Sequence, residues 1–263
     1  MLIAQLSDFH LGADWIDEDP AIAVAAAVAA VRALPERCDA VVVTGDVAEH
    51  AVDGEYELAL ELLAPLEVPT HVLPGNHDDR RKMRRHFELP GDDAAPIDYV
   101  VELGGVRVVM LDTTIPGADA GALGAEQLAW LDAELNSAPE TPTLLAMHHL
   151  PLRTGNAEWD QFGLSVDDRE ALRHALERHS QVRLIAGGHF HLALAGQLAG
   201  RPVFGAPSAY AGAQLDLGAQ RMRFTDDPIG FAVHVFLDDE VLSYVQAINR
   251  HARRRAPTEG RRM

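Results

Sequence analysis

Five short apolar runs, each followed directly by a polar cluster, constrain the fold of this chain more than any other feature of its sequence. Short, continuous aliphatic runs of this kind are typical of strands that are buried on both faces. The segments between them carry apolar residues three or four positions apart, which indicates amphipathic helices. This alternation of strand and helix predicts an α/β fold. The predicted strands span residues 2–6, 40–43, 70–73, 143–146 and 182–186.

Residues that favour the N-terminus of a helix indicate where two of the predicted helices begin. Pro20 follows a run of acidic residues, and proline is favoured in the first turn of a helix, so we expect a helix to begin there. Asp167 is the expected N-cap of the last helix. Further helices are expected at residues 54–66, 124–135 and 167–178. Two hairpins are expected at residues 192–205 and 231–248, with a long loop over residues 206–230 between them.

The polar clusters follow the carboxyl ends of the predicted strands, which is where ligands bind in open α/β sheets. Carboxylate, imidazole and amide donors without a thiolate suit Mn²⁺, Fe²⁺, Zn²⁺ or Co²⁺. Residues two apart in an extended chain point the same way, so Asp8 and His10, like His189 and His191, are expected to act as pairs. Asp46 is the expected bridging ligand between two metal ions. The candidate metal ligands are Asp8, His10, Asp46, Asn76, His148, His189 and His191.

Composition excludes several other functions. The formal net charge is −18, so nonspecific binding to a nucleic acid or to a membrane surface is not expected. Residues 21–33 are alanine-rich but too short for a membrane span. Because Cys38 is the single cysteine, no internal disulfide can form, and a cytoplasmic location is expected. The arginine-rich tail at residues 250–263 is expected to be a disordered end.

Five blocks, in this order along the chain, resemble those of calcineurin-like metallophosphoesterases. They are Asp8-Phe9-His10, Gly45-Asp46, Gly75-Asn76-His77-Asp78, His148-His149 and Gly188-His189-Phe190-His191. The opening block and the double histidine are most similar to those of the class III cyclic-nucleotide and glycerophosphodiester phosphodiesterases. The resemblance implies a four-layer α/β/β/α sandwich of two mixed sheets, with a dinuclear metal site at the carboxyl edge of the strands. The catalytic domain would span residues 1–249.

The resemblance also implies a role for each matching residue. One metal ion would be bound by Asp8, His10 and His191, the other by Asn76, His148 and His189, and both by Asp46. His77 would contact the phosphate or protonate the leaving oxygen, and Asp78 would orient His77. The metal ions would be Mn²⁺ or Fe²⁺, with Zn²⁺ or Co²⁺ as alternatives. The role of His149 stays open between support of a neighbouring ligand and a purely structural one.

The implied activity is hydrolysis of a small phosphodiester, either a 3′,5′-cyclic nucleotide or a glycerophosphodiester, by in-line attack of a metal-bridging hydroxide. Purple acid phosphatases are disfavoured, because Glu49 stands where they carry a tyrosine. Two alternatives remain: a phosphomonoesterase of the same superfamily, and an inactive metal-dependent module that binds a nucleotide or a partner protein. No stable nucleic-acid complex is expected, and a homodimer stays open.

Three further features near the motifs have two interpretations each. The basic residues between Arg80 and Arg85 are interpreted as a solvated helix face, with steering of an anionic substrate as the alternative. Trp15 is interpreted as a packing residue, with base stacking as the alternative. The loop at residues 205–210 resembles a loop that lines the substrate side in bacterial members of the family, and is expected to form a pocket wall.

Overall fold

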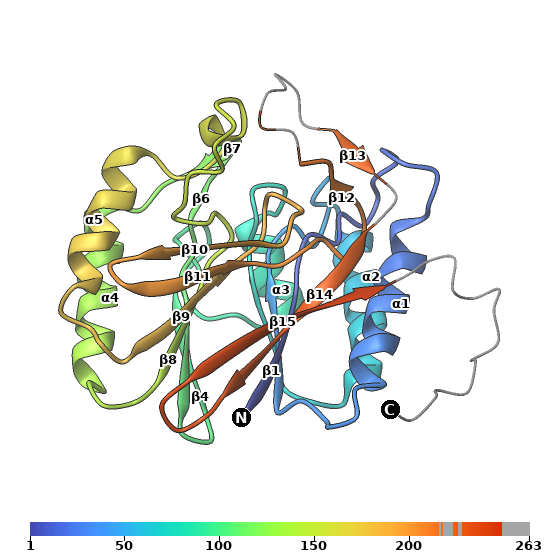
Figure 1. The fold of residues 1–263 in the computed structure, drawn as a ribbon. Coiled ribbons are helices and arrows are strands. Elements are labelled where there is room, and N and C mark those ends of the chain that lie inside the picture. The colour runs from blue at the N-terminus through green and yellow to red at the C-terminus, as the bar shows by residue number, and fades with distance from the viewer. Residues whose placement is uncertain (216, 218–222, 226–227, 249–263) are drawn as a thin grey trace.

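Two mixed β-sheets lie face to face at the centre of the computed structural model (Figure 1). The structure describes residues 1–215, 217, 223–225 and 228–248. The first sheet has the order β15-β14-β1-β2-β3, and the second has the order β10-β11-β9-β8-β5-β4. The first comprises β1 (Leu2–Leu6), β2 (Ala40–Thr44), β3 (Thr70–Leu73), β14 (Ile229–Phe236) and β15 (Val241–Ile248). The second comprises β4 (Tyr99–Leu103), β5 (Val106–Met110), β8 (Thr143–Ala146), β9 (Val182–Gly187), β10 (Leu194–Leu198) and β11 (Arg201–Gly205).

Parallel strands form the middle of both sheets. In the first sheet β1, β2 and β3 run parallel, and in the second β5, β8, β9 and β11 do. Antiparallel strands complete the edges, namely β14 and β15 in one sheet and β4 and β10 in the other. The carboxyl ends of the parallel strands therefore lie on one side of the molecule, at the top of Figure 1.

Helices cover the outer face of each sheet, so the predicted four-layer arrangement is confirmed (Figure 1). The first sheet is covered by α1 (Pro20–Arg32), α2 (Asp53–Leu63) with its 3₁₀ extension η1 (Ala64–Leu66), and α3 (Arg80–Phe87). The second is covered by α4 (Ala125–Ser137) and α5 (Val166–Leu176). Shorter elements are β6 (Thr114–Ile115), β7 (Ala118–Gly121), η2 (Trp159–Gln161), β12 (Gly212–Ala213) and β13 (Phe224–Thr225).

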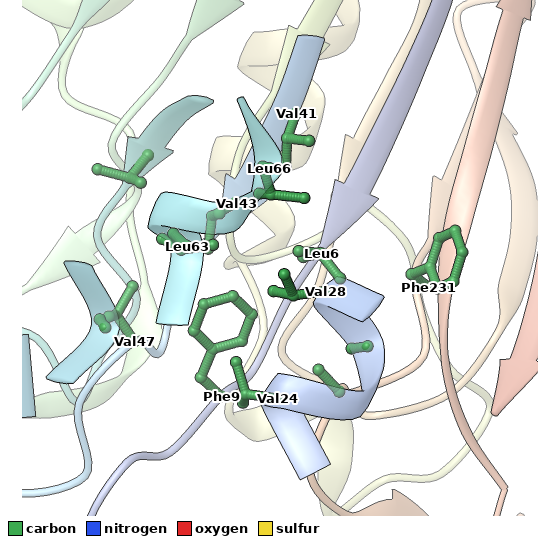
Figure 2. Close-up of a cluster of buried hydrophobic side chains, with 14 of the residues drawn as sticks. Leu6, Phe9, Val24, Val28, Val41, Val43, Val47, Leu63, Leu66 and Phe231 are labelled. Atoms are coloured by element: carbon green, nitrogen blue, oxygen red, sulfur yellow. The ribbon is translucent and has the colours of Figure 1, made fainter. Parts of the chain in front are cut away.

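Each helix layer packs on its sheet through a separate apolar cluster. Figure 2 shows the cluster under the first sheet, where the ring of Phe9 lies beside Val24 of α1. Phe190 lies in the corresponding cluster under the second sheet, where it stacks on Trp159 with ring centroids 6.2 Å apart. A third cluster, which includes Ile3 and Leu144, fills the space between the sheets. Both aromatic residues come from the middle of a predicted ligand block, so each block is anchored in a core.

The five strands predicted from the apolar runs are all present, and both predicted hairpins form as β10–β11 and β14–β15. Pro20 begins α1, as expected, with Asp19 as its N-cap. The N-cap predicted for α5 is wrong. The N-cap lies two residues earlier, because the hydroxyl of Ser165 accepts from the backbone N–H of Asp168 at 3.0 Å, which leaves Asp167 inside the first turn.

Some elements of the structure were not predicted, and some predicted regions lie partly or wholly outside the described residues. The hairpin of β4 and β5 was not predicted, and neither was the short hairpin of β6 and β7. The long loop expected at residues 206–230 contains β12, β13 and the start of β14, and part of it lies outside the described residues. The arginine-rich tail at 250–263 also lies outside them. Among the described residues, no helix combines the length and apolarity that crossing a membrane requires.

A buried polar chain joins the two sheets directly beneath the strand ends. The carboxamide of Gln5 in β1 donates to the hydroxyl of Thr44 in β2 at 2.9 Å and to the carbonyl of Gly187 in β9 at 2.8 Å. Its oxygen accepts from Nε2 of His234 in β14 at 2.9 Å, and Nδ1 of His234 lies 2.8 Å from the hydroxyl of Ser243. Burial lowers the pKa of His234 to about 3, so the folded chain holds this imidazole neutral.

We predict that His234 makes the protein sensitive to acid. Well above pH 6.5, the ordinary pKa of histidine, the imidazole is neutral in both the folded and the unfolded state. As the pH falls from 6.5 towards 3, the unfolded chain takes up a proton that the folded chain does not. The free energy of unfolding therefore falls, by about 1.4 kcal/mol per pH unit for this group. Urea unfolding between pH 7 and pH 4 should show a shallower acid slope for His234→Gln, whereas His174→Gln, at an exposed histidine, should keep the wild-type slope. Equal slopes for wild type and His234→Gln would contradict this role.

Candidate metal centre

The predicted ligands gather at the carboxyl edge of both sheets, in the loops that follow β1, β2, β3, β8 and β9. Phe9 and Phe190 lie in the two apolar cores, whereas the polar residues on either side of each ring lie in the site. Four groups of side chains come close enough to share a metal ion. They are Asp8, His10 and His191; Asp8, Asp46 and His148; His148, His149 and His189; and His10, Glu49 and His77.

The ligand loops have a left-handed backbone rather than an extended one. Positive φ angles occur at Asp8 (55°), His10 (44°), Asp46 (51°), His189 (74°) and His191 (54°). The expectation that residues two apart converge because the chain is extended is therefore wrong in its reason. β1 ends at Leu6, and the chain turns back beyond it. Each left-handed residue costs on the order of 1–3 kcal/mol, so the surrounding contacts must outweigh this strain.

One half of the site brings two imidazoles together. Nε2 of His10 lies 3.0 Å from Nε2 of His191 and 3.4 Å from Oδ2 of Asp46. Oδ1 of Asp8 lies 3.6 Å from Nε2 of His191. The other nitrogen of each ring donates outwards: Nδ1 of His10 to the Glu49 carboxylate at 2.8 Å, and Nδ1 of His191 to the carbonyl of Ala211 at 2.8 Å. These outward bonds direct both Nε2 atoms at the centre of the site.

The other half is built around His148. Its Nδ1 donates to the carbonyl of Thr44 at 2.7 Å. Its Nε2 lies 3.1 Å from Oδ1 of Asn76 and 3.3 Å from Oδ2 of Asp46. The ring of His189 lies 5.0 Å from that of His148, and its buried Nε2 has no hydrogen-bond partner among the described residues. Oδ2 of Asp46 thus lies between the two halves.

This arrangement fits divalent cations. The Nε2 atoms of His10, His148 and His191 face one another or oxygen acceptors, and the carboxylates of Asp8 and Asp46 are buried beside them. Lone pairs and buried carboxylates at such distances need a positive charge among them. A proton on His148 supplies part of this positive charge. Attraction to Asp46 outweighs the effect of burial and raises the pKa of His148 to about 9. Nitrogen and oxygen donors without sulfur suit Mn²⁺, Fe²⁺, Zn²⁺ or Co²⁺.

Charge in the site is unevenly distributed. Burial alone would raise the pKa of Asp46, but the neighbouring His148 and His10 outweigh it and hold this pKa well below its usual range. Burial lowers the pKa of His10 and of His189 well below the ordinary value, so both rings favour the neutral form that binds metal ions. Asp46 and His148 therefore form the charged pair at the centre.

His149 is held by the protein on both ring nitrogens. Nδ1 lies 2.8 Å from the hydroxyl of Thr113, which donates to it, and Nε2 donates to the carbonyl of Asp119 at 3.1 Å. Burial, together with the nearby His148, lowers the pKa of His149 to about 3. Its ring packs 4.5 Å from that of His189. Since both ring nitrogens are engaged by the protein, His149 packs against the candidate ligand His189 rather than being free to bind a metal ion itself.

The hydrogen bonds of Asp78 found among the described residues go to backbone amides rather than to the His77 ring that it was expected to orient. Its carboxylate accepts from the backbone N–H groups of Val47, Ala48 and Gly75 at 2.9–3.1 Å and so fixes the loops after β2 and β3. Burial and the nearby Asp46 raise its pKa to about 7. Its negative charge also contributes to raising the pKa of His77, so the expected role of orienting His77 stays a prediction. Asp78 acts on the loops that carry Asp46 and His77.

The residue that holds His77 is Glu49, which sequence reasoning did not assign to the site. Nδ1 of His77 donates to the carbonyl of Glu49 at 3.2 Å, and the Glu49 carboxylate lies 3.4 Å from the same atom. The carboxylate also accepts from Nδ1 of His10 and, at 3.2 Å, from Nε1 of Trp15. Its position three residues after Asp46, on the same loop, is the signal that could have indicated it.

The structure also bears on the basic residues of α3 and on the loop at residues 205–210. Arg80 pairs with Asp112 at 2.7 Å, and the buried Arg84 donates to four backbone carbonyls, so these two arginines are structural. Arg81 and Arg85 are exposed, as expected for a solvated helix face. The loop at residues 205–210 contains the buried Ser208, whose hydroxyl donates to the carbonyl of Asp8 at 2.8 Å. This loop therefore braces Asp8, a candidate ligand, from inside the protein.

Comparison with known proteins agrees with the geometry. Residues 1–193 match the family model of calcineurin-like phosphoesterases. The chain is 36% identical over 195 residues to the 3′,5′-cyclic adenosine monophosphate phosphodiesterase CpdA of Pseudomonas aeruginosa, an alignment that covers 73% of this chain and 70% of that one. It is 32% identical over 197 residues to a probable glycerophosphodiester phosphodiesterase, GpdQ, of Arcobacter nitrofigilis, covering 73% and 72%. A probable cyclic nucleotide phosphodiesterase of Rhodococcus erythropolis is 31% identical over 260 residues, covering 95% and 84%.

A solved structure shows the same fold. The dimetal phosphatase from Danio rerio superimposes with a TM-score of 0.70 and covers 94% of this chain and 96% of its own. Its sequence is 17% identical, so the likeness concerns the fold alone.

Glu49 is predicted to set the metal affinity. Glu49→Ala removes the acceptor for Nδ1 of His10, so that ring loses its orientation. We expect the Mn²⁺ dissociation constant, measured by titration calorimetry on chelator-treated protein, to rise about 10- to 100-fold. Glu57→Ala, at an exposed glutamate on α2, should leave it unchanged. An unchanged constant for Glu49→Ala would contradict this role.

A side chain at position 188 is predicted to disrupt the site. A Cβ there would lie 1.9 Å from Oγ of Ser7 and 2.6 Å from Oδ2 of Asp8, so the ligand loop must move. Gly188→Ala should lower the free energy of unfolding by about 1–3 kcal/mol in urea and weaken Mn²⁺ binding. Gly54→Ala is the matched control, because open space surrounds a Cβ at that position in α2. Equal stability of Gly188→Ala and wild type would refute the close approach of the two loops.

Proposed function

The chain belongs to the calcineurin-like phosphoesterase family, and on this basis we propose that it hydrolyses small phosphodiesters at the centre described above. The observation that carries the proposal is the convergence of three Nε2 atoms and two carboxylates, with each Nδ1 atom of those three rings turned outwards. The relatives named for cyclic nucleotides and for glycerophosphodiesters support the substrate class.

We assign two subsites to the donors. The first subsite consists of Asp8, His10 and His191, and the second consists of Asn76, His148 and His189. We assign Asp46 to both, since its Oδ2 lies within 3.4 Å of an imidazole nitrogen on each side. Divalent cations held there supply an activated water at neutral pH and balance the negative charge of the phosphoryl oxygens. We favour Mn²⁺ or Fe²⁺, which suit imidazole and carboxylate donors.

His77 is the residue of this chain that we assign to the leaving group. Its backbone N–H donates to Oδ1 of Asp46 at 3.0 Å, which fixes it beside the proposed bridging ligand. Because its Nδ1 donates to the carbonyl of Glu49, Nε2 is the ring nitrogen left to act on a substrate, and the side chain is 30% exposed. A ring held in this way can donate a hydrogen bond to a phosphoryl oxygen or to the departing oxygen.

Space beside the site favours a diester over a monoester. A cavity of about 260 Å³ borders Asn76 and lies between the start of α3 and the β6–β7 hairpin. Arg80 and Arg81 line it, so a polar second ester group can be accommodated there. A phosphomonoester has no second group to place in it. A reducing compartment such as the cytoplasm, and a homodimer, remain predictions of the sequence.

Substrate class is tested with two chromogenic esters. Chelator-treated protein reloaded with Mn²⁺ should hydrolyse bis(p-nitrophenyl) phosphate faster than p-nitrophenyl phosphate. Asn76→Ala should lose about 100-fold or more of the diester kcat, because a donor to one subsite is removed. Asn136→Ala, at an exposed asparagine of α4, should retain wild-type rates.

Other rates on these two esters would favour one of the two alternative functions, a phosphomonoesterase or a binding module. A faster rate on the monoester would indicate a phosphatase. No turnover of either ester by Mn²⁺-loaded protein would contradict the enzymatic function and favour a metal-dependent binding module.

A further inference from the structure

Two aromatic rings form a stacked pair at the side of the metal centre. Trp15, in the loop after β1, and Phe224, in β13, have ring centroids 4.7 Å apart and an interplanar angle of 27°. They are more than 200 positions apart in sequence, and β13 pairs with β12 to hold Phe224 in place. Figure 1 shows β12 and β13 above the strand ends, on the side where the ligands gather. We call Trp15 and Phe224 the aromatic platform.

The platform contacts one of the two proposed metal subsites. Trp15 lies 4.3 Å from the ring of His10, and Phe224 lies 5.1 Å from the ring of His191. The ring of Trp15 is also 6.2 Å from that of His77. A phosphate bound at this subsite therefore has its nearest ester substituent beside the platform.

The two rings differ in how firmly they are held. Trp15 is half-buried, donates from Nε1 to Glu49 at 3.2 Å, and packs near the buried ring of Tyr210. Phe224 stacks on Trp15 and is still 36% exposed. Water contact with a large aromatic face is unfavourable, and a flat apolar group that covers the face removes this cost. Trp15 is therefore the anchored ring of the pair. Phe224 is the outer ring, and its exposed face is available for stacking.

We propose that the aromatic platform binds the nucleobase of a 3′,5′-cyclic nucleotide, with Phe224 as the stacking surface. This inference rests on the proposed function and selects between its two substrate classes. The base stacks on the outer face of Phe224 while the cyclic phosphate lies at the subsite of His10 and His191. In a 3′,5′-cyclic nucleotide both ester bonds of the phosphate go to the same sugar, so base, sugar and phosphate stay close together. A platform beside the phosphate site can therefore contact the base.

A cationic headgroup is the competing occupant, because aromatic faces also attract quaternary ammonium groups. Stacking of a base on an aromatic side chain strengthens binding by roughly 5- to 150-fold. A cation over an exposed ring gains about 2- to 5-fold, and tight binding of such a cation takes several rings around it. Trp15 and Phe224 are close to parallel and so present one flat face. This geometry favours a planar base.

The test compares three diesters on Mn²⁺-loaded full-length protein. The substrates are 3′,5′-cyclic AMP, which carries a base, glycerophosphoglycerol, which carries neither a ring nor a positive charge, and glycerophosphocholine, which carries a quaternary ammonium group. For Phe224→Ala we expect the ratio of kcat/KM between cyclic AMP and glycerophosphoglycerol to fall about tenfold or more, mainly through KM for cyclic AMP. Phe224→Tyr, which keeps a six-membered aromatic ring, should restore the ratio. Tyr244→Ala, at an exposed tyrosine on β15, is the control for loss of a surface ring and should match wild type.

Three results would overturn the platform as a base site. They are an unchanged ratio in Phe224→Ala, an equal loss on all three substrates, and a larger loss on glycerophosphocholine than on cyclic AMP. Calorimetric binding of cyclic AMP separates this proposal from the proposed function. If wild type hydrolyses none of the three diesters, the proposed function fails, yet binding weakened about tenfold in Phe224→Ala still supports the platform, and equal binding refutes it.

Discussion

The alignment of two sheets along one shared edge is the constraint on which the site depends. Two buried hydrogen bonds cross that edge. The backbone N–H of His189, after β9, donates to the carboxylate of Asp8, after β1, at 3.0 Å, and Nδ1 of His148 donates to the carbonyl of Thr44 at 2.7 Å. Gln5 adds the link from β1 to β9 beneath them. A shift of one sheet against the other by a single residue would break these bonds and separate the ligands.

The parts that the sequence predicts are those with a local signal. An apolar run followed at once by a polar block defines a buried strand and its loop, so β1, β2, β3, β8 and β9 and the five motif blocks could be placed without a structure. The hairpin of β4 and β5 lacks that signal, because Arg107 interrupts the apolar run. This side chain is nonetheless buried, since its guanidinium donates to the carbonyl of Glu134 and pairs with Glu102 at 2.7 Å.

The parts that could not be predicted are contacts between residues far apart in sequence. Spacing indicated that Asp8 and His10 act together, but the left-handed turns that bring this about depend on the loops around them. The carboxylate of Asp78 is drawn to three backbone amides rather than to the adjacent ring. The stacking of Trp15 on Phe224 likewise has no signature in the composition of either segment.

The bond between Asp8 and His189 spans 181 positions of the chain, and this has a consequence for how the protein reaches its native state. Closing so large a loop loses conformational entropy before any contact compensates for it, and parallel strands joined by long crossovers add to that loss. Helices and hairpins made of neighbouring residues form first on such a landscape. The site is therefore built from contacts of high sequence separation, and a cation that binds it stabilises the complete fold relative to states in which the two sheets have not yet met.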